Sequence, residues 1–166
     1  MKLIFSLFIV LSLASCSAQK PGLKINKEDI WNWIATWKGE LVYKDSADTW
    51  NIESSVQISM AETDNQFVIK DQYPGKYKYP VSVDTLTITK NGSVKEGKLV
   101  EIWKSKTSKA IRFAIEKQTI YNGKKATIKS IYDFDRNNFV LRKEIKYKGE
   151  YKFNRLSDFQ GDRMAF

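Results

Sequence analysis

Histidine is absent from this 166-residue chain, and cysteine occurs only once. Without these residues the chain has no intramolecular disulfide, no Cys/His zinc site, no Ser-His-Asp triad and no Cys-His dyad. Glycine-rich phosphate loops and acidic calcium loops are also missing from the sequence. Only three prolines occur, while aromatic residues make up 13% of the chain, which excludes a disordered composition. We therefore expect a folded protein with no metal, no cofactor and no catalytic residues.

Apolar residues make up 42% of the chain, which is enough for one packed core in one domain. Lysine and arginine number 28 against 19 acidic residues, so the net charge is +9. Basic runs occur at residues 104–106, 124–125 and 142–152, the last with interleaved tyrosines. Such runs form either a surface for an anionic partner or a solvated face whose lysines protect strand edges.

The N-terminus has the features of an export signal. Lys2 is followed by an apolar run over residues 3–13, which is too short to span a bilayer. The run ends in Leu13-Ala14-Ser15-Cys16, which resembles the lipobox of bacterial lipoproteins and implies acylation of Cys16. The alternative is ordinary signal cleavage near Ser17, with Cys16 discarded.

We accordingly divide the chain into a signal peptide at residues 1–15, a lipid-anchored tether at 16–25 and a folded domain at 26–166. The acyl chains on Cys16 would supply the two or more hydrophobic anchors that stable membrane attachment requires. No aspartate or acidic tract follows Cys16. By resemblance to bacterial lipoproteins, this predicts an outer-membrane protein that faces the periplasm, where nucleic acid is not an expected partner.

A short helix at residues 27–36 is predicted first, with Asn26 as its N-cap. Four apolar residues then recur at the i, i+3, i+4 and i+7 spacing of one helical face: Ile30, Trp33, Ile34 and Trp37. After Trp37 the apolar period changes to two, which indicates strands. We predict these at residues 37–45, 52–61, 65–73, 82–90, 93–104, 109–120, 124–134, 138–147 and 150–156.

The connections between these strands are too short for parallel crossovers, so neighbouring strands run antiparallel. Asn91-Gly92 and Asn122-Gly123 are the strongest hairpin signals, because a type I′ turn needs positive φ at both central residues. The predicted fold is all-β, an antiparallel up-and-down meander barrel of about eight to ten strands with a short N-terminal helix. A two-sheet sandwich is the alternative.

Trp37-Lys38-Gly39 opens the first predicted strand, and Arg155 lies in the last. This arrangement resembles lipocalins and the wider calycin superfamily, in which a Trp of the first strand packs under an Arg of the last and closes the barrel base. The resemblance implies a barrel that binds a small molecule, with Trp37 and Arg155 as the closing pair. Residues 140–150 also resemble a hairpin of small, uncharacterised envelope proteins of Bacteroidetes-type bacteria, which implies no activity.

Alternation places two cations, Lys143 and Arg155, in otherwise apolar rows. A buried cation is costly unless it is paired, so these residues are candidates for binding a carboxylate or phosphate. The competing interpretations are that Arg155 caps Trp37 and that Lys143 reaches outward at a rim. The complete set of predicted ligand-binding residues is Lys143, Arg155, Tyr73, Phe113, Phe139 and Tyr147.

The predicted function is non-enzymatic binding of a small ligand inside the barrel, either apolar or amphipathic and with or without an anionic group. The alternative is a periplasmic protein-interaction module that uses its basic rim and has an interior filled by side chains. The carboxylate pairs Asp133/Asp135 and Glu144/Glu150 are the remaining candidates for acid–base chemistry. Their positions at turns and on solvent faces favour solvated side chains over a catalytic pair.

Overall fold

The computed structural model describes residues 23–44, 49–61, 63, 65–72 and 83–164. The elements are α1 (Lys27–Trp31), β1 (Ala35–Lys44), β2 (Thr49–Met60), β3 (Gln66–Gln72), β4 (Val83–Thr87), β5 (Lys98–Lys104), β6 (Ile111–Tyr121), β7 (Lys124–Asp135), β8 (Asn138–Tyr147) and β9 (Asn154–Arg163). Cys16, Tyr73 and the predicted signal segment 1–15 lie outside the described residues. No helix in the described ranges is long and apolar enough to cross a membrane.

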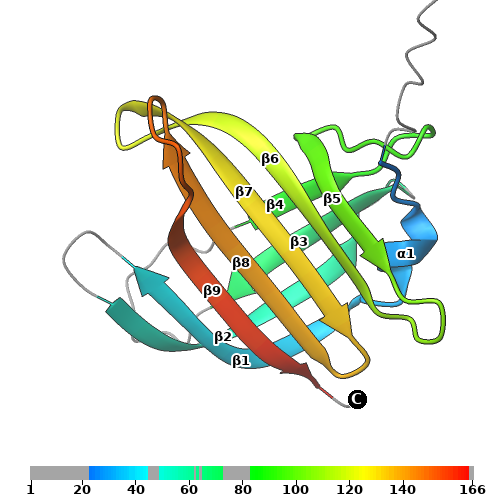
Figure 1. The fold of residues 1–166 in the computed structure, drawn as a ribbon. Helices are drawn as coiled ribbons and strands as arrows, with labels where there is room; N and C mark the ends of the chain where they lie inside the picture. The colour runs from blue at the N-terminus through cyan, green and yellow to red at the C-terminus, as the bar shows by residue number, and fades with distance from the viewer. Residues whose placement is uncertain (1–22, 45–48, 62, 64, 73–82, 165–166) are drawn as a thin grey trace, which may run out of the picture.

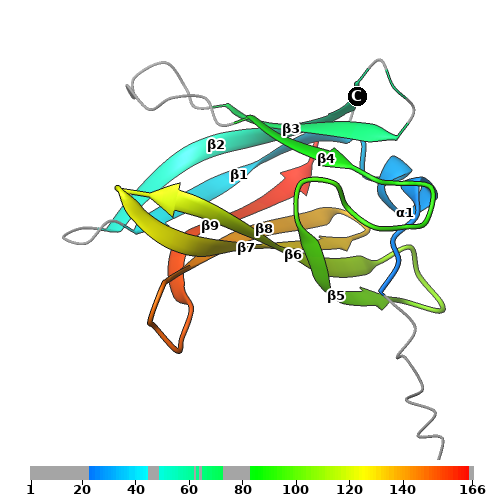
Figure 2. The ribbon, with the colours of Figure 1, turned by 90° about the horizontal axis from the view of Figure 1, so that it is seen from above.

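The nine strands form one antiparallel sheet in the order β4-β3-β2-β1-β9-β8-β7-β6-β5. The first strand pairs with the last along Trp37–Tyr43 and Ser157–Arg163, so the meander is continuous through β1 and β9. The sheet curls into a half-barrel whose edge strands are β4 and β5 (Figure 1). Seen from above, β1–β4 form one arm and β5–β9 the other (Figure 2). The predicted antiparallel meander is thereby confirmed, as one sheet and not as a two-sheet sandwich.

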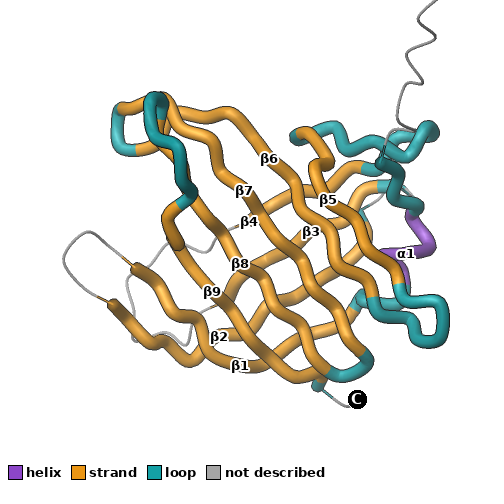
Figure 3. Tube along the Cα trace, viewed as in Figure 1, coloured by secondary structure: helices purple, strands orange, loops and turns teal. Residues whose placement is uncertain are grey.

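The half-barrel has two distinct ends. At one, which we call the helix end, α1 lies beside the β5–β6 turn (Figure 3), and Lys104 pairs with Asp29 there. The opposite end, which we call the far end, carries the β6–β7 turn and residues 148–153 (Figure 1). Asn122 and Gly123 form the β6–β7 turn with φ of 49° and 73°, as the Asn-Gly signal predicted.

Most element boundaries shift by a few residues from the predictions, and α1, β5 and β9 depart for identifiable reasons. α1 ends at Trp31, since the chain is already extended from Ala35; Trp33 and Trp37 still meet because one follows the helix and the other faces inward from β1. β5 begins at Lys98 because residues 88–94 form a small separate turn, closed by a bridge between Ile88 and Val94. β9 covers 154–163 and not 150–156.

Aromatic side chains fill the interior at the helix end. Trp33 stacks on Phe134 at 5.0 Å between ring centroids, and Phe134 stacks on Phe139 at 4.5 Å. Trp37 lies against both phenylalanines at 6.2 Å and 5.6 Å. All four rings are buried. Offset or tilted rings at these spacings add to the apolar burial of the core, so this end of the half-barrel is closed by packing.

Candidate functional site

Lys143 faces the interior of the half-barrel from the middle of β8. Its Nζ lies 2.5 Å from Oδ2 of Asp84 on β4, which belongs to the opposite arm of the sheet. The Lys143 side chain is 18% exposed and that of Asp84 is 41% exposed. A cation in an apolar row therefore has a counter-ion, as burial of a charge requires, and the ion pair joins the two arms across the interior.

A small cavity lies beside this ion pair. Its polar wall consists of Lys143, Asp71, Ser54 and Ser157. Its apolar wall consists of Leu41, Val56, Leu141 and Phe159. The volume of about 10 Å³ is enough for one water molecule. The four polar residues come from β8, β3, β2 and β9, so the curl of the sheet brings together groups that are far apart in the sequence.

Tyr132 lies on β7 and is buried in the core. Its ring stacks on Phe113 with 4.8 Å between centroids. Burial raises the pKa of the Tyr132 hydroxyl well above its ordinary value, and the nearby carboxylates of Asp84 and Asp71 raise it further. The hydroxyl therefore stays protonated at physiological pH and adds a neutral polar group to the interior.

The other predicted ligand-binding residues have different surroundings. Phe113 and Phe139 are buried in the core, where their faces are covered by neighbouring rings. Tyr147 lies at the far end, with the Lys124 Nζ 5.9 Å from its ring centroid. Arg155 is the second residue of β9 and pairs with Asp158 at 3.4 Å. Of the predicted residues that the structure describes, Lys143 is the one at an interior polar cavity.

The cation over Trp37 is Arg163 and not Arg155. The Arg163 guanidinium carbon lies 5.9 Å from the Trp37 ring centroid, and the two residues are paired in the β1–β9 register. Arg163 Nη2 also donates to the Ile34 carbonyl at 3.5 Å. The prediction placed the last strand too early in the sequence, which assigned the closing role to Arg155. Trp37 thus has a cation of the final strand over its ring, at Arg163.

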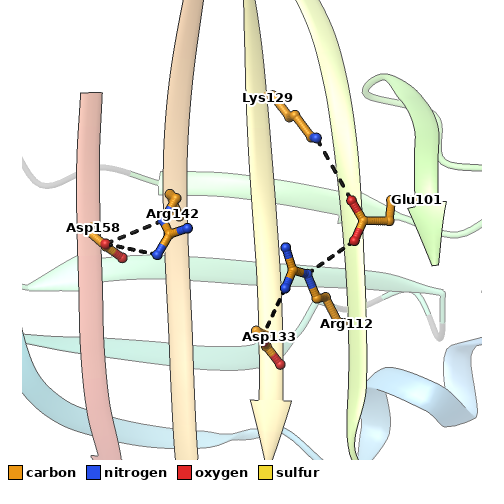
Figure 4. Close-up of polar contacts among 6 residues, drawn as sticks. All are labelled: Glu101, Arg112, Lys129, Asp133, Arg142 and Asp158. Atoms are coloured by element: carbon orange, nitrogen blue, oxygen red, sulfur yellow. Dashed lines mark hydrogen bonds and ion pairs between the residues drawn. The ribbon is translucent and has the colours of Figure 1, made fainter. Parts of the chain in front are cut away.

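The outer face of β5–β9 carries a set of neutralised charges, drawn in Figure 4. Arg112 lies 3.1 Å from Glu101 and 4.0 Å from Asp133, and Lys129 lies 3.9 Å from Glu101. Beside them, Arg142 contacts Asp158 at 3.3 Å. Asp133 is thus part of a set of ion pairs on the exterior. Within the described residues, no second carboxylate lies across a cleft from it as a catalytic pair would.

The turn carboxylates have local roles. Asp135 accepts the backbone N–H of Arg136 at 2.8 Å, and Glu150 accepts that of Tyr147 at 3.0 Å. Such bonds satisfy backbone donors at hairpin turns. In the part of the chain that the structure describes, no group of three or more acidic or cysteine side chains is placed to hold a metal ion.

A second depression, which the sequence did not predict, lies at the helix end. It has a volume of about 540 Å³ and lies among residues 32–33 after α1, the β5–β6 turn at 106–109, the β7–β8 turn at 136–137 and Arg163. The basic run at 104–106 was its only sequence signal. The other cations come from distant parts of the chain, so only the tertiary structure brings them together.

No protein-family model matches this chain, and no curated protein matches it. Among solved structures it is similar to a protein of unknown function from the DUF3598 family of Nostoc punctiforme PCC 73102. The identity is 13% and the TM-score is 0.36, over 86% of this chain and 47% of that one. This chain thus spans about half the length of that neighbour. The structure is that of a curled antiparallel β half-barrel with an ion pair across its interior.

Proposed function

We propose that this chain is a non-enzymatic, lipocalin-like binding protein of the bacterial envelope, which holds the anionic head of a small amphipathic molecule at Lys143. The observation that carries this proposal is the Lys143–Asp84 ion pair inside the half-barrel. The cavity beside this lysine has serine hydroxyls and an apolar wall, which suit a carboxylate head with a hydrocarbon tail, and it also contains one carboxylate, that of Asp71.

Binding in this proposal is an exchange of counter-ions. The cavity now has space for about one water molecule, at about 10 Å³, so a ligand head must take the place of the Asp84 carboxylate. Asp84 is the more exposed partner and lies on the five-residue edge strand β4, whose described ladder pairs only with β3. Displacement of β4 therefore breaks fewer backbone bonds than displacement of any interior strand.

The packing of the interior limits the route and depth of the ligand. Aromatic rings fill the helix end, so a ligand would have to reach Lys143 from elsewhere. Leu41, Val56 and Leu141 line the cavity beside the lysine, where they would contact the first carbons of the tail.

Palmitate and hexadecanol provide a matched pair of probes, because they share a tail and differ in head charge. We expect palmitate to bind more tightly, and Lys143→Met to weaken palmitate binding about tenfold or more, as expected for loss of a charge-assisted hydrogen bond. Asp84→Asn should tighten palmitate binding, because it removes the carboxylate paired with Lys143 and leaves Asp71 as the remaining acidic residue of the cavity. Lys129→Met, which removes an exterior lysine, is the control and should leave binding unchanged.

Calorimetric titration of the four proteins measures these affinities, and thermal unfolding checks that each variant is folded. Native mass spectrometry of protein taken from its own membrane should in addition show a lipid-like bound mass. Equal affinity for palmitate and hexadecanol in the wild type, or loss of palmitate binding in Asp84→Asn, would contradict the exchange of counter-ions.

We further propose that acylated Cys16 anchors the protein in the outer membrane, facing the periplasm. The support is the Leu13-Ala14-Ser15-Cys16 sequence behind its apolar run. Cys16→Ser should move the protein from the membrane fraction to the soluble periplasmic fraction and abolish labelling by radioactive palmitate. Ser17→Ala is the matched control, and a Cys16→Ser protein that remains membrane-bound and labelled would refute the anchor.

A second candidate function is binding of an envelope protein through the far end. Two large apolar side chains are exposed there, Ile120 at 71% and Tyr151 at 99%. Exposed Lys124 and Lys125 lie in the same turn region. Crosslinking in the periplasm tests this candidate, because a Lys124→Glu/Lys125→Glu variant should lose the crosslinked partner. An unchanged crosslinking pattern would exclude the Lys124 and Lys125 region of the far end as the contact surface.

A further inference from the structure

We propose that the depression at the helix end is a phosphate-binding site, separate from the Lys143 cavity. Its basic side chains are Lys106 and Lys109 from the β5–β6 turn, Arg136 from the β7–β8 turn and Arg163 from the end of β9. Three segments that are remote in the sequence thus place four cations around one volume of about 540 Å³.

The charge of this site is not neutralised. The residues that line it include no aspartate or glutamate. None of the four basic side chains takes part in an ion pair within the described residues, whereas Lys104, at the end of the neighbouring strand, pairs with Asp29. Like charges held together repel one another unless an anion lies between them. The arrangement therefore favours an anionic ligand.

Neutral donors surround the same volume. The Trp33 side chain also lines the depression, but its Nε1 atom is itself buried and is not available to a ligand there. Lys109 Nζ donates to Asn32 Oδ1 at 3.3 Å, which holds that lysine at the rim of the site. The hydroxyls of Thr107 and Ser108 lie in the same turn.

These donors fit a phosphate better than a carboxylate. A phosphate group has a charge of up to about −2 and three strong acceptor oxygens on a monoester, so several donors can bind it from different sides. The planar guanidinium groups of Arg136 and Arg163 match two phosphate oxygens at once. A carboxylate, with one charge and two oxygens, would leave part of this donor set unused. The volume also exceeds that of the phosphate alone, so the group attached to it has space.

Two sources could supply the phosphate: a soluble phosphate ester or the head group of a phospholipid. The tether leads to the helix end, because Ile25 donates its backbone N–H to the Gly92 carbonyl at 2.9 Å just before α1. Residues 16–22 can extend over at most about 25 Å. If the proposed anchor at Cys16 holds, the helix end lies on the membrane side of the half-barrel, where lipid phosphates are available.

The experiment uses the folded chain without its signal peptide and three probes. Glycerol 3-phosphate, titrated by calorimetry, tests the soluble source. Vesicles of phosphatidylglycerol in phosphatidylcholine, compared with phosphatidylcholine alone, test the lipid source. Palmitate tests the Lys143 cavity independently, so failure of either proposal can be recognised separately.

The test variant is Lys106→Gln/Lys109→Gln/Arg136→Gln, which leaves Arg163 on Trp37 unchanged. The control is Lys70→Gln/Lys98→Gln/Lys117→Gln, which removes three exposed lysines that line no described pocket and lowers the net charge equally. We expect the test variant to lose tenfold or more in affinity for glycerol 3-phosphate or for the anionic vesicles. The control should change less than twofold, and both variants should retain palmitate binding.

Saturable binding of glycerol 3-phosphate supports a soluble ligand, and binding that needs phosphatidylglycerol vesicles supports a lipid head group. In both cases the loss must be confined to the test variant. Equal losses in the two variants would show that net charge alone attracts the probe and would overturn the site. Absence of saturable binding to both probes would overturn it as well.

Discussion

β1 and β9 approach each other closely at Gly39, and this approach depends on glycine. Gly39 lies opposite Gly161 in the β1–β9 register. A Cβ added at Gly39 would lie 1.9 Å from the Gln160 carbonyl oxygen and 2.4 Å from the Gly161 Cα. Both clashing atoms belong to the backbone, so no side-chain rotation can relieve them. Gly39→Ala must therefore push β1 away from β9.

The expected cost is large. Overpacking that side chains can partly absorb costs about 1–3 kcal/mol, and a backbone clash of this kind belongs at or above the upper limit. At about 2–4 °C per kcal/mol for a chain of this size, a loss of about 3 kcal/mol lowers Tm by roughly 10 °C. Gly123→Ala is the control, because nothing lies within 4 Å of its added Cβ. With φ of 73° at Gly123, it should cost only about 1 kcal/mol of backbone strain.

Thermal and urea unfolding, followed by circular dichroism, measure both losses. If β1 and β9 pair as described, Gly39→Ala should be destabilised about three times as much as Gly123→Ala. Equal destabilisation of the two variants would refute the close approach at Gly39, and with it the continuity of the sheet through the first and last strands.

Three further predictions concern Tyr132, the aromatic core and the closing arginine. Because the pKa of Tyr132 is raised in the folded state, its contribution to stability is fully present below about pH 10 and falls by up to about 1.4 kcal/mol per pH unit above pH 10. Tyr132→Phe should therefore make the fall in unfolding free energy at alkaline pH shallower. An unchanged slope in this variant would contradict burial of the hydroxyl. Phe139→Ala should cost about 3–5 kcal/mol in urea unfolding, whereas Tyr151→Ala, at a 99% exposed residue, should leave Tm unchanged; similar effects of the two would mean that the core is misplaced. Double-mutant cycles with Trp37→Phe should give a coupling of about 0.5–1 kcal/mol for Arg163→Met and none for Arg155→Met, and the reverse result would restore Arg155 as the closing residue.

Local sequence patterns predicted most of this fold correctly, and their failures were local. The β6–β7 turn was predictable because Asn122 and Gly123 tolerate positive φ. The start of β9 was not, because Tyr151 and Phe153 continue an apparent alternation through residues that lie outside the final strand. The apolar residue that faces inward from β9 is Phe159, and the row around it contains Gly161, which has no side chain to mark a face.

The candidate sites were less predictable than the fold. Alternation placed Lys143 inside, but its partner Asp84 lies on the opposite arm of the sheet and has no sequence relation to it. The helix-end depression was not predicted, because it combines Lys106, Arg136 and Arg163 from three separate turns and strand ends. Arrangements of this kind depend on how far the sheet curls, which periodicity in a single strand does not encode.

The sequence by itself determined the antiparallel meander within β1–β4 and within β5–β9, because short turns cannot carry parallel crossovers, but it did not determine that β4 and β5 remain edge strands that do not pair with each other. It also determined which strand faces are apolar, because successive side chains point to opposite sides of a sheet. Only the tertiary structure decided that β1 closes on β9, that Lys143 meets Asp84 across the interior and that four cations gather at the helix end. These contacts join residues through the curvature of the whole sheet, and curvature is a collective result of twist and packing that no local stretch of sequence specifies.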